Sequence, residues 1–70
     1  GIAQITKEMI ENKKKEYILK AIEFFEEDID DIVSDGTEVL LSKKGVGKML
    51  PLSSFGGGLS SALDIITCLL

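Results

Sequence analysis

Three consecutive glycines near the carboxyl end constrain the fold of this chain more than any other feature. Pro51-Leu52 and two serines lead into Gly56-Gly57-Gly58, and an apolar run from Leu59 to Leu70 follows. Glycine runs commonly separate elements, so a flexible linker before an ordinary buried helix is one interpretation. A helix start also offers free N–H groups and the positive end of the helix dipole, which favour an anion. The second interpretation is therefore a phosphate contact.

Chain length and composition limit the classes of protein that fit. Seventy residues make one small domain or a piece of a larger one, and such a chain buries only about 60% of its unfolded surface. The single cysteine and the absence of histidine and arginine exclude an intrachain disulfide and a histidine-based zinc site or catalytic base. We expect a reducing, cytoplasmic setting. The net charge of −4 argues against direct nucleic-acid binding, and the apolar run is too short to span a membrane.

Apolar residues at three- and four-residue steps predict a long N-terminal helix. The face comprises Ile18, Ala21, Ile22, Phe25, Ile29 and Ile32 or Val33. Asn12 is suited to cap a helix that begins near Lys13. Residues 1–10, with Ile2, Ile5, Met9 and Ile10, form either a separate helical turn or the upstream part of the same helix. Tyr17, Phe24 and Phe25 are expected in the core.

Short strands are expected in the middle of the chain. The Asp35-Gly36 turn separates 32–34 from 37–41, and a second turn at 43–45 leads into 46–50. We therefore predict an α+β fold of helical residues 1–30, an antiparallel β-meander over 31–51, a glycine loop over 52–58 and a C-terminal helix over 59–70. These four segments form a single small piece.

The closing helix carries a stripe of apolar residues. Its members are Leu59, Ala62, Leu63, Ile66, Leu69 and Leu70. Cys68 is expected to be partly buried beside this stripe and chemically inert. Phe55 is expected to anchor the loop so that the glycines face outward. The blunt end of the stripe suggests that the helix, and the protein, continue.

Two short motifs suggest ligand sites but lack required residues. Gly45-Val46-Gly47-Lys48-Met49 has Met49 where a phosphate-binding loop needs Ser or Thr, and Ser42 where it needs glycine. The acidic run from Glu26 suggests a calcium loop, but a loop that starts at Asp31 has Val33 at its third position and Ser42 where the twelfth position needs glutamate. A hairpin turn and a solvated helix end explain these segments better.

In the order of its elements, the chain resembles ABC-type ATPases of the SMC, RecF and OLD-like group, the broad set of predicted AAA/ABC ATPases of prokaryotes. The resemblance covers most of residues 16–70 and lies in "EDIDDI", the Asp-Gly hairpin and "KMLPLSSFGGGLSSALDII". In the family, an "lPLSsLGdGl" signature loop before the Walker B strand opens an apolar helix. The resemblance implies that the chain is a fragment of a P-loop NTPase (ABC-type) domain. Gly57 replaces the polar residue usual between the loop glycines, and Ser60 and Ser61 replace a following basic residue.

The resemblance also implies a role for the loop in ATP binding. Ser54 matches the signature serine, and Gly56 matches the loop glycine whose backbone approaches the γ-phosphate of ATP held by the opposite subunit. Gly58 matches the glycine that opens the following helix, and with Gly57 between them these residues form the expected cofactor-binding set. Walker A, Walker B and the catalytic glutamate are missing. The parent protein would be an ATPase using ATP and magnesium, whereas this chain alone would bind no cofactor and be inactive.

Two kinds of partner are expected. The first is the rest of the ATPase head, and the second is another copy of the chain in a symmetric dimer formed through the last helix, at Leu63 and Ile66, or through the sheet edge. Neither a membrane nor a nucleic acid is expected as a direct partner. The alternative function is a self-standing small dimerising protein-interaction module.

Overall fold

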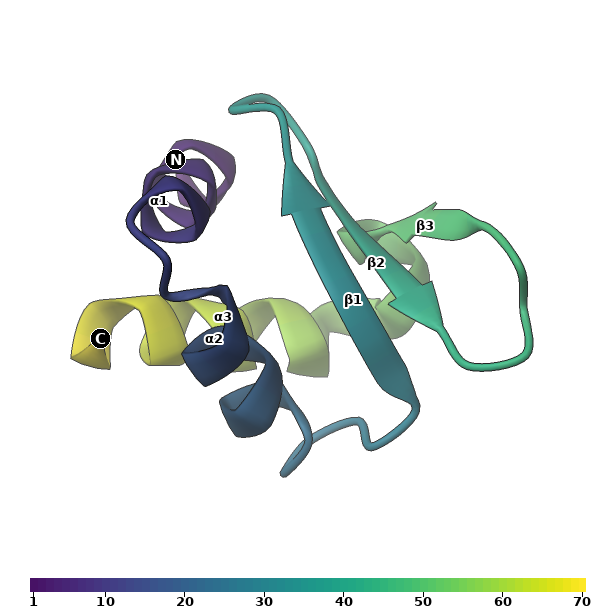
Figure 1. Cartoon of the computed structure of the whole chain (residues 1–70). Helices are drawn as coiled ribbons and strands as arrows, with labels where there is room; N and C mark the ends of the chain where they lie inside the picture. The colour runs from purple at the N-terminus through teal and green to yellow at the C-terminus, as the bar shows by residue number, and fades with distance from the viewer.

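Three α-helices and a three-stranded antiparallel sheet form two layers in the computed structural model, which describes all residues 1–70 (Figure 1). Along the chain the elements are α1 (Ile2–Glu11), α2 (Lys15–Ile22), β1 (Ile29–Ser34), β2 (Val39–Lys43), β3 (Met49–Pro51), the 3-10 helix η1 (Leu52–Phe55) and α3 (Gly56–Leu69). The predicted α+β class with an antiparallel meander is therefore confirmed. Nothing in this small antiparallel fold indicates a P-loop NTPase, and that origin stays a prediction.

Of the two alternatives for residues 1–10, the separate helix is confirmed, because α1 and α2 are two short helices. The prediction that the second helix continues to residue 30 is wrong. Asn12 ends α1 instead of capping α2, and Lys13 adopts a left-handed conformation with φ of 64°. Such a residue cannot continue a right-handed helix. Lys13 therefore separates α1 from α2. Helix α2 itself ends at Ile22, well before residue 30.

A β-bulge explains why β1 looked helical in sequence. Ile29 and Ile32, three residues apart, are both buried on this strand. The register with β2 shifts between Ile29 and Asp31, and an extra residue at a bulge brings side chains three apart onto one face. The spacing that suggested a continued helix is the spacing of a bulged strand.

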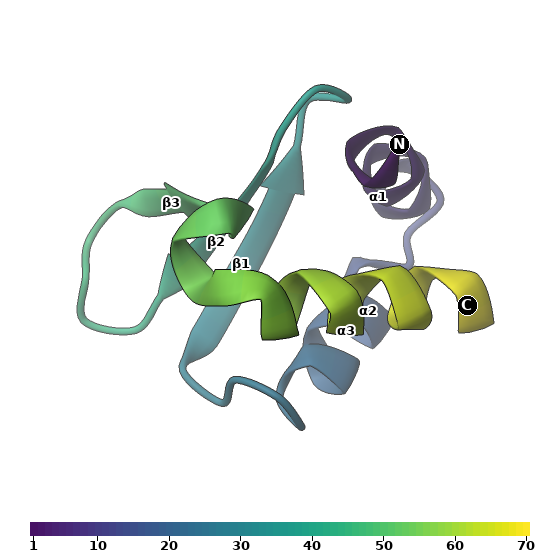
Figure 2. The same cartoon turned by 180° about the vertical axis from the view of Figure 1, so that it is seen from behind.

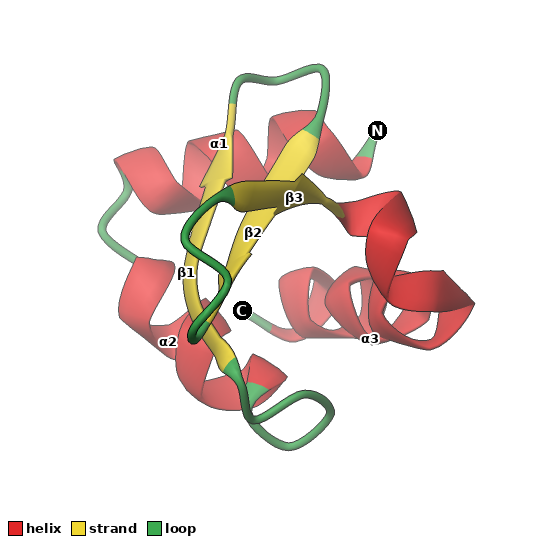
Figure 3. Ribbon diagram, turned by 90° about the vertical axis from the view of Figure 1, so that its right-hand side faces the viewer, coloured by secondary structure: helices red, strands yellow, loops and turns green.

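The sheet order is β1-β2-β3, and its rows show which side chains face the helices. Ile32, Leu41 and Leu50 are aligned across the three strands on the covered face. Val33, Leu40 and Pro51 form the next row and therefore point to the opposite face. Figure 3 shows the sheet in front of the helices, with no helix over this open face.

The second and third strands begin two and three residues later than predicted. β2 begins at Val39 rather than at residue 37, and β3 begins at Met49 rather than at residue 46. A four-residue loop connects β1 and β2, in which the Asp35 carboxylate accepts hydrogen bonds from the N–H groups of Thr37 (2.8 Å) and Glu38 (2.9 Å). These bonds lower the pKa of Asp35 below its ordinary value of 3.8.

The core lies between the sheet and α3, which crosses behind the strands in Figure 1 and in front of them in Figure 2. Its twelve buried apolar residues are Ala3, Met9, Ile18, Ile22, Ile29, Ile32, Val39, Leu41, Leu52, Leu59, Leu63 and Ile66. The predicted stripe of the last helix is confirmed for its first four residues, but Leu69 is 79% exposed. Since Leu63 and Ile66 belong to the core, they are not available as a dimer interface.

Several side chains that were expected inside the domain lie on its surface. Tyr17 and Phe25 are more than half exposed, and Phe24 is 89% exposed. Cys68 is also exposed. The aromatic residues miss the core because α2 ends before Phe24 and buries Ile18 and Ile22 instead.

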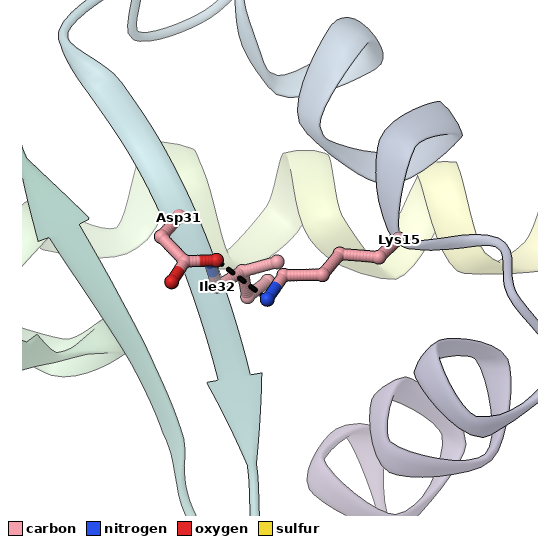
Figure 4. A network of polar contacts seen from close by, with 3 residues as sticks. All are labelled: Lys15, Asp31 and Ile32. Carbon is pink, nitrogen blue, oxygen red and sulfur yellow. Dashed lines mark hydrogen bonds and ion pairs between the residues drawn. The ribbon is translucent and has the colours of Figure 1, made fainter.

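Two polar contacts join the helices to β1. The Ser34 hydroxyl donates to the Ala3 carbonyl at 2.6 Å, and Lys15 at the start of α2 forms an ion pair with Asp31 at 2.6 Å (Figure 4). The hydrogen bond from Lys15 is the main reason that the pKa of Asp31 lies below its ordinary value of 3.8. The Ile32 N–H adds a hydrogen bond to the same carboxylate.

Candidate functional site

The predicted site residues lie together at one exposed corner, where η1 meets α3. Ser53, Ser54 and Gly56 to Gly58 are all exposed. We call these residues the glycine corner. Its three glycines are the first residues of α3, so they belong to the helix and not to a preceding loop.

Two apolar side chains hold the glycine corner in place. Leu52, at the start of η1, is buried in the core. Phe55 at its end is partly buried and packs against the same cluster. The expectation that Phe55 anchors this segment is therefore confirmed. The intervening serines face solvent because both anchors on this single 3-10 turn point inward.

The fold requires glycine at only one of the three glycine positions. Gly56 has a φ of 82°, a conformation in which other residues are strained. Gly57 and Gly58 do not have positive φ values, and a Cβ on either would meet no atom within 4 Å. The fold therefore explains Gly56 but does not require glycine at the next two positions.

The local charge at the glycine corner comes from the backbone. No charged residue occurs between Lys48 and Asp64. No side chain caps α3, and no acid stands in its first turn. The first N–H groups of a helix lack acceptors within it, and the dipole gives this end partial positive charge. The glycine corner is thus chemically suited to weak contact with an anion, without a lysine or a magnesium ligand of its own.

Other candidate sites have less structural support. Gly45 and Gly47 have positive φ values in the β2–β3 loop, as a tight turn requires. No group of three or more acidic, histidine or cysteine side chains is arranged to hold a metal ion. The exposed aromatic residues around Phe24 are the surface feature that sequence reasoning missed.

By length and composition, the helical stretch Leu52–Leu69 is long and apolar enough to cross a membrane. It is longer than the sequence run suggested because η1 and the glycines join it. Its α-helical part has 14 residues, or about 21 Å, against a hydrocarbon core of about 30 Å. Within the domain 28% of the stretch is buried, and its buried residues form one side of the core.

Comparisons with protein-family models, curated proteins and solved structures find no match for this chain.

Proposed function

We propose that the glycine corner contacts the phosphate groups of a nucleotide held by another polypeptide, the role that the resemblance to ABC-type signature loops implies. Gly57 and Gly58 carry the proposal, because neither backbone conformation nor packing demands glycine there. Each glycine in a helix costs up to about 1 kcal/mol relative to alanine. Bare backbone at an outward-facing helix start is what close approach to a phosphate needs.

The proposed contact is auxiliary to binding elsewhere. The Ser54 hydroxyl and a few N–H groups would donate to phosphate oxygens. High affinity would come from the lysine loop and magnesium of the partner chain. In this scheme the chain is a non-catalytic part of an ATPase head, and ATP and magnesium belong to the assembled parent protein.

Titration of the isotopically labelled chain with Mg-ATP, followed by NMR of backbone amides, tests this proposal. We expect binding weaker than about 1 mM, with shifts confined to residues 53–59. Ser54→Ala and Gly58→Glu should reduce these shifts. Ser61→Ala, an exposed serine further along α3, is the matched control and should leave them unchanged. Shifts centred elsewhere, or tight binding by the isolated chain, would contradict the proposal.

A dimerising interaction module is the second candidate function. The observation that favours it is an exposed apolar pair, Ile65 and Leu69, one turn apart on α3. Leu70 beside them is also exposed. An exposed apolar strip on a small domain favours association. If a second copy covers this strip, the chain functions through association, and nucleotide has no effect on it.

A further inference from the structure

We propose that the turn between α2 and β1 is a docking surface for an arginine- or lysine-rich, partly apolar segment of a partner protein. We call this surface the acidic–aromatic turn; it comprises Tyr17, residues 23–28 and Asp30. The inference rests on residues remote in sequence from the glycine corner and is independent of the proposed function.

Three aromatic side chains at the acidic–aromatic turn are exposed to solvent. Tyr17 lies on α2, and Phe24 lies in the turn that follows this helix. Phe24 is the most exposed large apolar residue of the domain, and Phe25 beside it is also exposed. The small surface depression of the domain is lined by Lys20, Glu23 and Phe24. Aromatic residues displayed in this way are characteristic of protein-recognition surfaces.

The backbone that carries these side chains is held by hydrogen bonds. The N–H groups of Phe25 and Glu26 donate to the Ile22 carbonyl at 2.8 and 2.9 Å, and the Lys44 N–H donates to the Asp28 carbonyl at 2.8 Å. A partner would therefore meet a pre-formed surface and would not bear the entropic cost of ordering it.

Charge identifies the chemistry of the partner. Residues 23–31 contain six acids and no lysine, whereas the rest of the chain has eight lysines and six acids. Only Asp31 of these six forms an ion pair, with Lys15. The unpaired acids Glu23, Glu26, Glu27, Asp28 and Asp30 surround the two phenylalanines in sequence. Basic groups complement these carboxylates, and an arginine also binds favourably over an aromatic ring.

The same charges disfavour the other occupants of an apolar surface. A second copy of the chain placed face to face would bring two acidic surfaces together, which is repulsive. Nucleic acid and anionic lipid surfaces are repelled for the same reason. The apolar strip at Ile65 and Leu69 has only Asp64 as a charged neighbour on α3, so the two surfaces differ in the partner they fit.

The experiment uses a short fluorescent peptide of alternating arginine and leucine as the probe, with a glutamate–leucine peptide as its control. Fluorescence anisotropy gives the affinity, and amide NMR shifts give the location. We expect the basic peptide alone to bind, with shifts confined to residues 16–30 and an affinity that falls with added salt. Phe24→Ser combined with Phe25→Ser should weaken binding about tenfold. The pair Ile65→Ser and Leu69→Ser, which removes two other exposed apolar side chains, on α3, should have no effect.

A charge-neutral variant tests the electrostatic half of the proposal. Glu26→Gln, Glu27→Gln and Asp28→Asn together should also weaken binding about tenfold, whereas Glu8→Gln, Glu11→Gln and Glu38→Gln together should not. Circular dichroism verifies that each variant is folded, as expected because none of these positions is buried. Equal affinity in the two charge variants, peptide shifts centred on α3, or self-association that the phenylalanine variant abolishes would each overturn the proposal.

Discussion

At the scale of single residues, Thr6 is the one buried polar side chain without a hydrogen-bond partner. It lies on the inner face of α1 between Ala3 and Met9, and its hydroxyl forms no hydrogen bond. From the apolar set of this segment one expects Ile5 inside, but Ile5 is exposed and Thr6 is fully buried. The period of α1 aligns Thr6, not Ile5, with the core residues.

Thr6→Val should stabilise the domain, because valine has the same shape without the unpaired hydroxyl. We expect the free energy of unfolding to rise by about 1 kcal/mol in urea titrations. Thr67→Val is the matched control, since the Thr67 hydroxyl donates to the Leu63 carbonyl at 2.9 Å. A loss of stability in Thr6→Val would mean that the hydroxyl has a partner after all.

Asp31 and Asp35 should make the domain less stable in acid. Both carboxyls have pKa values below the ordinary value of 3.8, through Lys15 and through backbone N–H groups respectively. A group with a lowered folded-state pKa stabilises the fold above its unfolded pKa, and this contribution is lost as pH falls through the folded value.

Urea titrations at pH 6 and at successive values below 4 measure the effect. Asp31→Asn should flatten the acid branch of the stability profile. Its cost at pH 6 should stay below about 1 kcal/mol, because the side chain is 44% exposed and solvent screens the pair. An acid branch unchanged in Asp31→Asn would exclude this carboxyl as a source of pH dependence.

At the scale of elements, the β1–β2 loop fits closely against α1. A Cβ on Gly36 would lie 2.8 Å from the Gln4 side-chain oxygen, and its φ is 92°. Gly45, in the β2–β3 loop, has a similar φ of 84° but no atom within 4 Å. Substitutions at these two glycines therefore distinguish the cost of backbone strain from the cost of steric crowding.

Gly36→Ala should destabilise the domain more than Gly45→Ala does. Backbone strain alone costs about 1 kcal/mol at each position, and the contact with Gln4 adds to it at Gly36. Thermal unfolding of both variants gives the difference, and Gln4→Ala combined with Gly36→Ala should recover part of it. Equal losses at both glycines would show that the Gln4 side chain moves away freely.

The glycine corner shows the same distinction at the start of a helix. Since Gly57 and Gly58 have room for a side chain, Gly57→Ala and Gly58→Ala should each stabilise α3 by about 0.5 kcal/mol in urea titrations. Gly56→Ala should instead destabilise it because of its left-handed φ of 82°. Destabilisation by all three substitutions would mean that the fold itself requires the bare backbone.

At the scale of the whole molecule, the exposed strip on α3 predicts self-association. Sedimentation at high concentration should show a dimer that Ile65→Lys combined with Leu69→Lys converts to a folded monomer. Substituting the core residues Leu63 and Ile66 should unfold the chain instead. A wild-type monomer at the highest concentrations would contradict this prediction.

Local sequence signals predicted much of this fold. They failed where a three-residue spacing of apolar side chains fits both a helix and a bulged strand. The Asp-Gly loop, the meander and the apolar stripe of α3 were visible because turn chemistry and periodicity are local. Ile29 and Ile32 were assigned to a helix because a bulge gives a strand the same spacing. The glycine corner was found from glycine and serine alone, but the exposure of Phe24 depends on where α2 ends, which tertiary packing decides.

The exposed thiol of Cys68 has a practical consequence for every measurement of association. It lies on α3 between Ile65 and Leu69. Air oxidation would therefore join two chains by a disulfide, and the product would be mistaken for a non-covalent dimer. Sedimentation therefore requires a reducing agent throughout. The same atom offers a unique attachment point for a maleimide dye or nitroxide, because no second thiol competes for the reagent.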